Sequence, residues 1–265
     1  MPPRYVTFNP IRSIGVPFAT YIKPDHMYRS IAEISAARHI LFPEYWQVNA
    51  LVYALKKKIF PSAATYHLGH DKIETTRALA AACPHMVPRT GIFSQQTAEF
   101  EALAADFGVP FVCKEVKSAS GLGVFLIKCR RDFDELIRTN PVVYVQEYLD
   151  IHRDLRVVVV GDGVVSAYWR IGQPGAFHNN LARGGTIDRS GIPDQVLREV
   201  AAVSRNLGIN HAGFDVAVTD TGVFILELNP FFGTRGIPVT AAEMGRIIHH
   251  YLSSGTRDVP GLRSA

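Results

Sequence analysis

One segment, from His211 to Gly236 (HAGFDVAVTDTGVFILELNPFFGTRG), constrains the fold of this chain more strongly than any other. Within it, two apolar runs at residues 213–218 and 223–228 flank the turn sequence Asp220-Thr221-Gly222. Short apolar runs around a turn of this kind predict a β-hairpin.

Three oxygen-bearing side chains, Asp215, Glu227 and Asn229, interrupt these runs. Glu227 and Asn229 are two residues apart, so on a strand they point to the same face. A three-residue loop, with Gly222 in the left-handed conformation, would place Asp215 directly opposite Glu227 on that face. A two-residue loop would put Asp215 and Glu227 on opposite faces, and the sequence leaves both open.

The chemistry of these three side chains suits a metal ion. A carboxylate is costly to bury in an apolar strand unless something positive compensates it. Two carboxylates and one amide oxygen suit a hard cation such as Mg²⁺, or Mn²⁺ in its place. The apolar neighbours argue against the alternative, an acidic hairpin with its charges in solvent. We predict that Asp215, Glu227 and Asn229 hold the metal.

Composition places the chain among globular proteins. Its 265 residues, 47% hydrophobic and 20% charged, supply a core for one large domain or two to three small lobes. The net charge is +4, and the one basic block, Lys56-Lys57-Lys58, closes a predicted helix, where cations complement the helix dipole. We therefore expect no specific nucleic-acid partner.

The cysteines and the hydropathy pattern bear on the cellular compartment. Cys83, Cys113 and Cys129 are odd in number and lie among apolar residues, which is typical of buried, reduced thiols in a cytosolic protein. No signal-peptide core follows Met1, and no apolar run approaches the length of a membrane span. We expect a cytoplasmic protein without a membrane partner; homo-oligomerisation is left open.

The first 68 residues alternate between strand and helix patterns. Strands are predicted at 5–8 and 39–42, and helices at 29–38 and 45–57. The segment is shorter than a complete dinucleotide-binding unit and has no glycine-rich fingerprint, so we expect a small α/β lobe.

A lysine stands at the start of the next predicted helix. Asp71 and Glu74 form a capping box for a helix that ends before Pro84. Lys72 then lies in the first turn, where a cation opposes the helix dipole. An anionic ligand would explain this placement; an exposed lysine is the alternative.

A loop of small residues, Ser118 to Gly123, lies between predicted strands at 110–116 and 124–129. Small residues let backbone N–H groups approach phosphates, and Lys114 lies on the strand that leads into the loop. We predict phosphate contacts from Lys114, Ser120, Gly121 and Gly123. Helices are predicted on either side of this unit, at 94–107 capped by Ser94 and at 132–138 with a capping box of Asp132 and Glu135.

A strand is predicted at 142–149, and it ends in Gln146-Glu147-Tyr148-Leu149. A strand that runs into a hinge can present backbone groups to a nucleotide base, and Glu147 is available to the ribose or the adenine amino group. The alternative is an ordinary edge strand.

Two further strands, at 155–160 and 164–170, are joined at Gly161-Asp162-Gly163. A three-residue loop would put Asp154, Arg156 and Arg170 on one face. Two arginines on one sheet face can clamp a carboxylate or a phosphate, whereas a surface charge ladder is the alternative.

The loop at 172–187 is too polar for a core and too long for a plain connection. Asn180, Arg183 and the paired glycines Gly184-Gly185 would suit a loop that contacts a ligand. His178 is a candidate base, although a single loop histidine is more often incidental. A helix at 194–206 leads back to the hairpin. The last helix, at 240–252, has a capping box of Thr240 and Glu243, and a frayed tail is expected beyond it.

Two lysines, a glycine loop, an arginine face and a carboxylate–amide floor are the parts needed to hold ATP with Mg²⁺. In five segments the chain resembles the ATP-grasp ligases, and within them the RimK-like glutamate ligases. The resemblance covers roughly residues 69 to 237 and rests on HDKIETTRALA, FVCKEVKSASGLGVFLI, YVQEYL, DLRVVVVGDGVVSAYWRIGQPGAFHNNLARGG and GFDVAVTDTGVFILELNP.

The resemblance implies an ATP-grasp fold of α+β and α/β class, in which two α+β subdomains clamp ATP behind a short N-terminal α/β lobe. We expect the lobe at 1–68, the ATP-grasp domain at 69–255 with subdomains at 69–145 and 146–255, and a flexible tail at 256–265.

The resemblance also implies a role for each matching residue. Lys72 and Lys114 contact phosphates, Glu147 and Tyr148 lie at the adenine hinge, and Asp154 helps to hold the nucleoside end. The metal is held by Asp215, Glu227 and Asn229. Catalysis is implied for Arg170, which steadies the transferring group, with Asn180 near the γ-phosphate and Arg183. The full set of implied ATP contacts is Lys72, Lys114, Ser120, Gly121, Gly123, Gln146, Glu147, Tyr148, Leu149, Asp154, Arg156, His178 and Asn180.

The activity implied is an ADP-forming ligation of a carboxylate to an amine, both borne by small molecules or peptides, through an acyl phosphate. A kinase of the same fold and a non-catalytic ATP-binding regulator are the rival hypotheses; the complete metal set and Arg170 argue against the regulator. Residues 230–235 read PFFGTR where RimK-like ligases usually have a Ser-Ser-Pro-Gly pattern, so glutamate as substrate does not carry over. Glu115 also stands after Lys114 where proline is common, and residues 42–49 match no pattern of the family.

Overall fold

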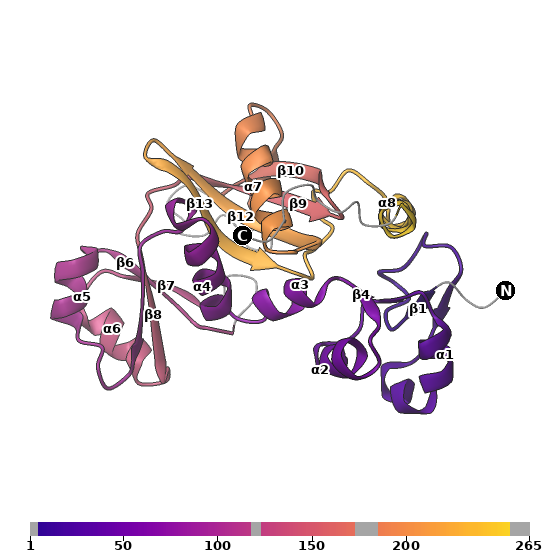
Figure 1. The fold of residues 1–265 in the computed structure, drawn as a ribbon. Helices are drawn as coiled ribbons and strands as arrows, with labels where there is room; N and C mark the ends of the chain where they lie inside the picture. Colours follow the sequence, from indigo (N-terminus) through magenta and orange to yellow (C-terminus); the bar gives the residue numbers. More distant parts are fainter. Residues whose placement is uncertain (1–4, 118–122, 173–184, 255–265) are drawn as a thin grey trace, which may run out of the picture.

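The computed structural model describes residues 5–117, 123–172 and 185–254, which form three sheets with their helices. The sheets follow one another along the molecule, with the five-stranded sheet in the centre (Figure 1). None of the helices in these ranges has the length and apolar character needed to cross a bilayer.

The N-terminal sheet has four parallel strands in the order β2-β1-β3-β4. They are β1 (Tyr5–Thr7), β2 (Ala19–Tyr21), β3 (His39–Leu41) and β4 (Lys58–Phe60). Around them lie η1 (Pro24–Arg29), α1 (Ile31–Ala36), α2 (Tyr45–Asn49) and η2 (Ala50–Ala54), a π-helical continuation of α2. The two predicted strands and both predicted helices are present, whereas β2 and η1 were not predicted.

The lysine block does not close its own helix, contrary to the prediction. The helical segment ends at Ala54, and Lys58 already belongs to β4. Lys57 instead donates from Nζ to the carbonyl oxygens of Ser35 and Ala37, at 2.9 and 2.5 Å. Its charge therefore complements the C-terminal end of α1.

The second sheet is antiparallel, in the order β5-β8-β6-β7. Its strands are β5 (Thr90–Ser94), β6 (Phe111–Lys114), β7 (Val124–Ile127) and β8 (Val142–Glu147), and its helices are α5 (Phe100–Phe107) and α6 (Arg130–Ile137). Phe107, Phe111 and Phe133 are central to its core.

Two predicted helix starts in this part are wrong. Ser94 ends β5, and a turn in which its carbonyl accepts from Thr97 and Ala98 separates it from α5. Asp132 is the third residue of α6 rather than its cap, because its carboxylate accepts from the N–H of Lys128 and of Cys129. Cys129 is the cap and is exposed, not buried as predicted, whereas Cys83 and Cys113 are buried.

The central sheet is antiparallel, in the order β11-β10-β9-β12-β13. Its strands are β9 (Arg153–Val160), β10 (Gly163–Ile171), β11 (Thr186–Asp188), β12 (His211–Thr219) and β13 (Gly222–Asn229). The accompanying helices are α3 (Ala63–Leu68), α4 (Lys72–Ala82), η3 (Pro84–Met86), α7 (Asp194–Asn206) and α8 (Ala241–Ser253).

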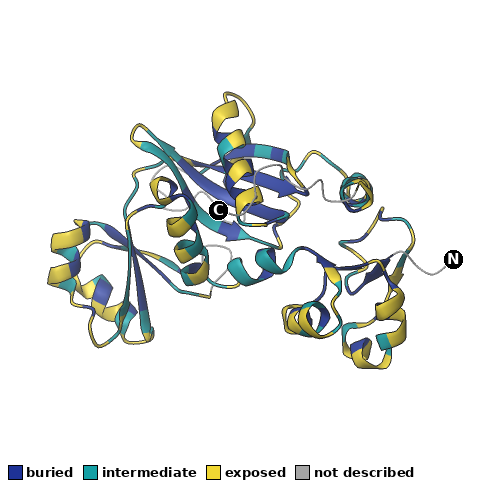
Figure 2. Cartoon of the chain, viewed as in Figure 1, coloured by how far each residue is buried: buried dark blue, intermediate teal, exposed yellow. Residues whose placement is uncertain are grey.

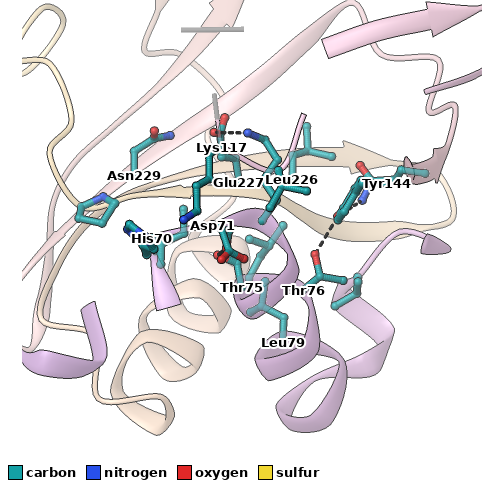
Figure 3. A pocket seen from close by; sticks show the side chains of 18 residues that line it. His70, Asp71, Thr75, Thr76, Leu79, Lys117, Tyr144, Leu226, Glu227 and Asn229 are labelled. Carbon is teal, nitrogen blue, oxygen red and sulfur yellow. Dashed lines mark hydrogen bonds and ion pairs between the residues drawn. The ribbon is translucent and has the colours of Figure 1, made fainter. Parts of the chain in front are cut away.

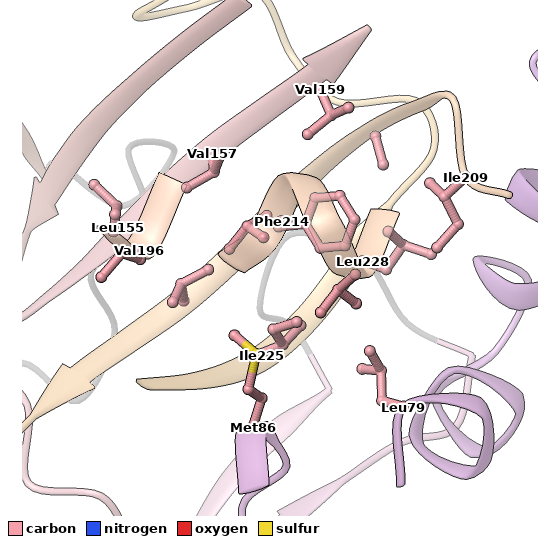
Figure 4. Close-up of a cluster of buried hydrophobic side chains, with 14 of the residues drawn as sticks. Leu79, Met86, Leu155, Val157, Val159, Val196, Ile209, Phe214, Ile225 and Leu228 are labelled. Carbon is pink, nitrogen blue, oxygen red and sulfur yellow. The ribbon is translucent and has the colours of Figure 1, made fainter. Parts of the chain in front are cut away.

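The central sheet is buried on both faces, because alternate residues of β9 enter different cores (Figure 2). Leu155, Val157 and Val159 pack with Phe214 against α7 and η3 (Figure 4). Val158 and Val160 pack on the other face with Tyr5 and Phe60 of the N-terminal sheet and with α8. On this second face the apolar contacts occupy one end, which leaves the other end to polar side chains.

The loop after β1 is packed tightly against α8. A Cβ atom added to Gly245 would lie 2.0 Å from the carbonyl oxygen of Ile14, and one added to Gly15 would lie 2.3 Å from that of Ala242. The two backbones therefore approach one another more closely than any side chain would allow.

The close contact at Gly245 gives a first prediction. Glycine to alanine inside a helix normally stabilises by about 1 kcal/mol. We expect Gly245→Ala to destabilise instead, by about 1–3 kcal/mol, because the loop must move away from α8. Urea denaturation measures the change, with Gly163→Ala as the control because a Cβ there would meet nothing within 4 Å. An increase in the stability of Gly245→Ala would contradict the packing described.

Candidate functional site

A β-bulge decides where the hairpin carboxylates point. The loop has two residues, since Thr219 pairs with Gly222, so of the two alternatives left open by the sequence the shorter loop is present. The register then shifts between Asp215 and Val216, which leaves Leu226 as an extra residue on β13. This extra residue reverses the alternation, and Asp215 consequently lies directly opposite Glu227, as the three-residue alternative had required.

The same device operates between β9 and β10. Val160 pairs with Gly163 across a two-residue loop, and a register shift between Val164 and Ser166 corrects the parity. Asp154 is therefore the direct partner of Arg170. The loop is therefore not the three-residue loop that the sequence analysis considered, and the bulge nevertheless gives the shared face which that loop would have produced.

The buried ion pairs on this face centre on Asp215. Asp215 is the cross-strand partner of Arg156, whose Nε lies 2.6 Å from Asp215 Oδ1. Arg170 Nη2 lies 2.9 Å from Asp215 Oδ2, and Arg170 Nε lies 2.6 Å from Asp154 Oδ1. Burial raises the pKa of Asp154 to about 6, against the lowering effect of Arg170. These charged side chains are largely buried and paired with one another, so the alternative of a charge ladder on the protein surface is wrong.

Gly213 makes room for Arg156. A Cβ atom at Gly213 would lie 2.4 Å from Arg156 Nη1 and 3.0 Å from the Cβ of Phe232. The absence of a side chain thus lets the guanidinium lie close to the backbone of β12.

The two predicted lysines, Lys72 of α4 and Lys114 of β6, both contact β13 beside these ion pairs. Lys72 is buried, not exposed, and its Nζ is 3.6 Å from Glu227 Oε1. Lys114 Nζ donates to Gln146 Oε1 at 2.6 Å and to the carbonyl of the bulge residue Leu226 at 3.4 Å. Burial lowers the pKa of Lys114 to about 8, although Glu227 opposes the shift. Burial and the charge of Asp215 raise the pKa of Glu227.

A cavity of about 400 Å³ lies between α4, β8 and β13 (Figure 3). One part of its wall is polar and contains Lys72, Glu227 and Asn229. Another part is largely apolar and contains Leu79, Val87, Tyr144 and Ile225. The remaining lining residues are Gly69, His70, Asp71, Thr75, Thr76, Val116, Lys117, Gln146, Leu226, Leu228 and Pro230.

Of the residues that α4 supplies to this wall, Lys72 was predicted and Thr75, Thr76 and Leu79 were not. Thr75, Thr76 and Leu79 follow Lys72 at helical spacing, which would have placed them on its face of the helix. A 2.7 Å hydrogen bond between the hydroxyl groups of Thr76 and Tyr144 joins α4 to β8 of the second sheet (Figure 3).

Several predicted ATP contacts make other contacts in the structure. Glu147 Oε1 accepts from the backbone N–H of Arg89 at 2.6 Å, and the Tyr148 hydroxyl donates to Asp150 at 3.1 Å. Neither Glu147 nor Tyr148 lines the cavity, nor does Leu149. The carbonyl of Gly123 accepts from the N–H of Glu115. The remaining predicted residues, Ser120, Gly121, His178, Asn180 and Arg183, lie outside the described residues.

The three predicted metal ligands form an all-oxygen set suited to a hard cation. Glu227 and Asn229 line the cavity, and Asp215 is paired with Glu227. Asp215 Oδ1 is close to Arg156 but accepts no hydrogen bond, so it keeps lone pairs for a ligand. No group of three His, Cys, Asp or Glu side chains clusters as a metal site anywhere in the described part of the chain, and the candidate set here has two carboxylates and one amide. The donor chemistry fits Mg²⁺ if phosphate or water oxygens complete the shell.

Comparison with known proteins gives consistent matches. The family model "RimK-like ATP-grasp domain" matches residues 69–248. A probable alpha-L-glutamate ligase of Enterobacter sp. (strain 638) is 31% identical over 176 residues, which are 64% of this chain and 58% of that protein. A ribosomal protein bS6–L-glutamate ligase of Shigella boydii serotype 4 is 30% identical over 195 residues, 69% of this chain and 65% of that protein. The chain thus spans about three fifths of the length of these relatives.

Solved structures confirm the predicted ATP-grasp fold. A RimK domain protein from Sphaerobacter thermophilus superposes with a TM-score of 0.71 at 18% identity, covering 94% of this chain and 98% of that one. A D-alanine–D-alanine ligase from Bacillus anthracis, complexed with ATP, superposes with a TM-score of 0.69 at 11% identity, covering 94% and 97%.

The two carboxylates of the hairpin are expected to differ in their contribution to stability. Asp215→Asn leaves buried guanidinium charge uncompensated and should cost about 3 kcal/mol of unfolding free energy. Glu227→Gln should change it by less than about 1 kcal/mol, because Glu227 forms one longer ion pair beside the cavity. Urea denaturation of both variants at pH 7 measures the difference. Equal losses would contradict this division of roles.

Proposed function

Because the chain belongs to the RimK-like ATP-grasp family, we propose that it is an ATP-dependent ligase that joins a carboxylate to an amine. The single observation that carries the proposal is the cavity wall where Lys72 meets Glu227 and Asn229, with Lys114 held behind it. Both relatives described above bear the names of glutamate ligases, which supports the same reaction class.

The proposed reaction has two steps. A carboxylate oxygen of the acid attacks the γ-phosphorus of ATP, and the bond to the bridging oxygen of ADP breaks. The resulting acyl phosphate is attacked at its carbonyl carbon by the amine. Phosphate then leaves with the oxygen that came from the carboxylate, and the amine nitrogen loses a proton as the amide forms. No covalent bond to the protein is needed.

Charge at the site favours binding of an anion. Four cations, Lys72, Lys114, Arg156 and Arg170, face three carboxylates, Asp154, Asp215 and Glu227, so one positive charge is in excess. Lys72 and Lys114 would neutralise phosphate oxygens, and their partners on β8 and β13 hold them in place.

The way in which Arg170 is held supports the role proposed for it. Asp154 and Asp215 orient its guanidinium, which we assign to the transferring phosphoryl group. Catalytic roles for Asn180 and Arg183 belong to the same proposal. Mg²⁺ or Mn²⁺, held by Asp215, Glu227 and Asn229, would supply further charge neutralisation when bound.

The substrates are proposed only as classes. The acid and the amine are small molecules or peptides, and the bS6 ligase among the relatives makes a protein acceptor one of the candidates. The segment 230–235 differs from the RimK-like pattern, so the identity of the acid is not transferred from the relatives.

The proposal is tested by measuring ADP formation with a panel of amino acids, acidic peptides and amines. We expect ADP release that depends on an acid and an amine together, and mass spectrometry should find the amide. A phosphorylated alcohol would instead indicate a kinase, and the absence of ATP turnover with the whole panel would contradict a ligase.

Glu227→Gln tests the metal assignment within the same assay. We expect a loss of about 100-fold or more in Mg²⁺-dependent ADP formation with the fold retained. Glu135→Gln, which removes an exposed carboxylate on α6, is the matched control and should retain activity. Undiminished Mg²⁺-dependent turnover in Glu227→Gln would overturn the assignment.

The pKa of Lys114 predicts how ATP affinity depends on pH. Below about pH 8 the buried ammonium is protonated and attracts phosphate; above that value it is increasingly neutral in the free protein. We expect the affinity for Mg·ATP to fall by up to about tenfold per pH unit above pH 8. Lys114→Arg, which stays charged, should show a flatter profile.

Calorimetry in buffers of different ionisation enthalpy provides a second readout on the unmodified protein. Binding at pH 9 should take up close to one proton, and binding at pH 7 should take up almost none from this group. No uptake at pH 9 would contradict the assigned contact.

A further inference from the structure

Arg12 lies in the loop between β1 and β2, and the loop is held without help from its guanidinium. The N–H of Arg12 donates to Asn9 Oδ1 at 3.0 Å, and Ser13 Oγ donates to the carbonyl of Asn9 at 2.7 Å. Gly15 packs against Ala242 of α8. The side chain of Arg12 is therefore presented from a fixed backbone and is not required to shape it.

The guanidinium of Arg12 contacts Phe231, one residue beyond the cavity wall in sequence. Its Cζ is 5.0 Å from the ring centroid of Phe231, the residue that follows Pro230 in the cavity wall. The Phe231 ring also makes an edge contact with Tyr66 at 5.5 Å. Tyr66 belongs to α3, which leads directly to Gly69 and His70 of the same wall.

Arg12 differs from the other arginines that contact aromatic rings in the described part of the chain. Arg89, Arg130 and Arg153 also lie over rings, and each has a carboxylate partner as well. These pairs are Arg89 with Phe107 and Asp106, Arg130 with Phe100 and Glu101, and Arg153 with Trp169 and Asp188.

Arg12 has no carboxylate within ion-pair distance among the described residues. Its guanidinium donates one long hydrogen bond, 3.5 Å, to the carbonyl oxygen of Phe231. Outside the described ranges, Asp258 is the one acidic side chain. Burial lowers the pKa of Arg12, as expected for a cation without a compensating charge.

We propose that Arg12 binds a carboxylate of an amino-acid substrate, one that does not itself react with ATP. The inference rests on the proposed ligase function, which supplies amino acids as substrates. A guanidinium presents two parallel N–H groups to a carboxylate, and the Phe231 ring holds its plane from one side. The carboxylate belongs to either the amine substrate or the activated acid.

The experiment measures binding to the full chain saturated with Mg·ADP by isothermal titration calorimetry. The probes are L-glutamate, L-aspartate, L-alanine and glycine, each paired with its α-carboxamide. We expect at least one amino acid to bind more tightly than its carboxamide. Arg12→Ala should weaken binding of that amino acid by about 10- to 100-fold and leave binding of the carboxamide and of Mg·ADP unchanged.

Two further variants separate recognition from structure. Arg12→Lys should recover part of the lost affinity, because it keeps the charge but not the paired N–H groups. Arg130→Ala removes an arginine that lies over a ring and already has Glu101 as partner, so it should leave all affinities unchanged.

Three results would overturn the inference. In the first, the wild-type protein binds no amino acid more tightly than its carboxamide. In the second, Arg12→Ala weakens binding of the amino acid and of its carboxamide equally. In the third, Arg12→Ala weakens binding of Mg·ADP. Because binding is measured without turnover, this experiment is independent of the ligase proposal. Failure of the ligase proposal is seen in the other assay, in which no ADP would form in response to an acid and an amine. With an active substrate pair, a higher KM for the amine alone or for the acid alone in Arg12→Ala identifies which substrate bears the carboxylate.

Discussion

Asp215 is a buried carboxylate between two guanidinium groups, and the geometry of the site depends on that arrangement. A lone charge in this sheet would be too costly to bury, so Asp215 is paired with Arg156 of the neighbouring strand β9 and with Arg170 of β10, the next strand beyond it. Arg156 reaches Asp215 as its direct cross-strand partner, and Arg170 reaches it because the bulge at Val165 turns Arg170 to the same face. The bulge at Leu226 turns Glu227 to this face beside the cavity and directs the Leu226 carbonyl at Lys114.

The charged face of the central sheet is covered by residues from both of the other sheets. At one end of the face, Val158 and Val160 are covered by the N-terminal sheet and α8. At the other end, α4 and β8 supply Lys72, Gln146 and Tyr144, so the cavity has walls from two lobes. The same packing positions the loop of Arg12 against α8, beside the segment that follows β13. The phosphates of a nucleotide and the carboxylate of a substrate would thus meet lysine and arginine side chains that the surrounding packing already holds in place.

Features that depend on residue type and spacing could be predicted from the sequence. Features that depend on irregularities of the backbone, such as the two β-bulges, could not. The hairpin and the family were predicted correctly, whereas the shared faces were left dependent on loop lengths that the structure does not have. The bulges at Val165 and Leu226 have no mark in the sequence, because both are apolar residues in apolar runs. Ser94 was taken for a helix cap because a turn after a strand uses the same residue types. The contribution of Arg12 depends on contacts between residues 219 positions apart, which no local pattern contains.

The central claim, that the site activates a carboxylate with ATP, is tested most directly by following oxygen. The acid substrate is labelled with ¹⁸O in its carboxylate, and the phosphate released with the amide is analysed by mass spectrometry. The account predicts one ¹⁸O atom in each phosphate, because the carboxylate oxygen leaves with the phosphoryl group. Unlabelled phosphate formed together with the amide would contradict it.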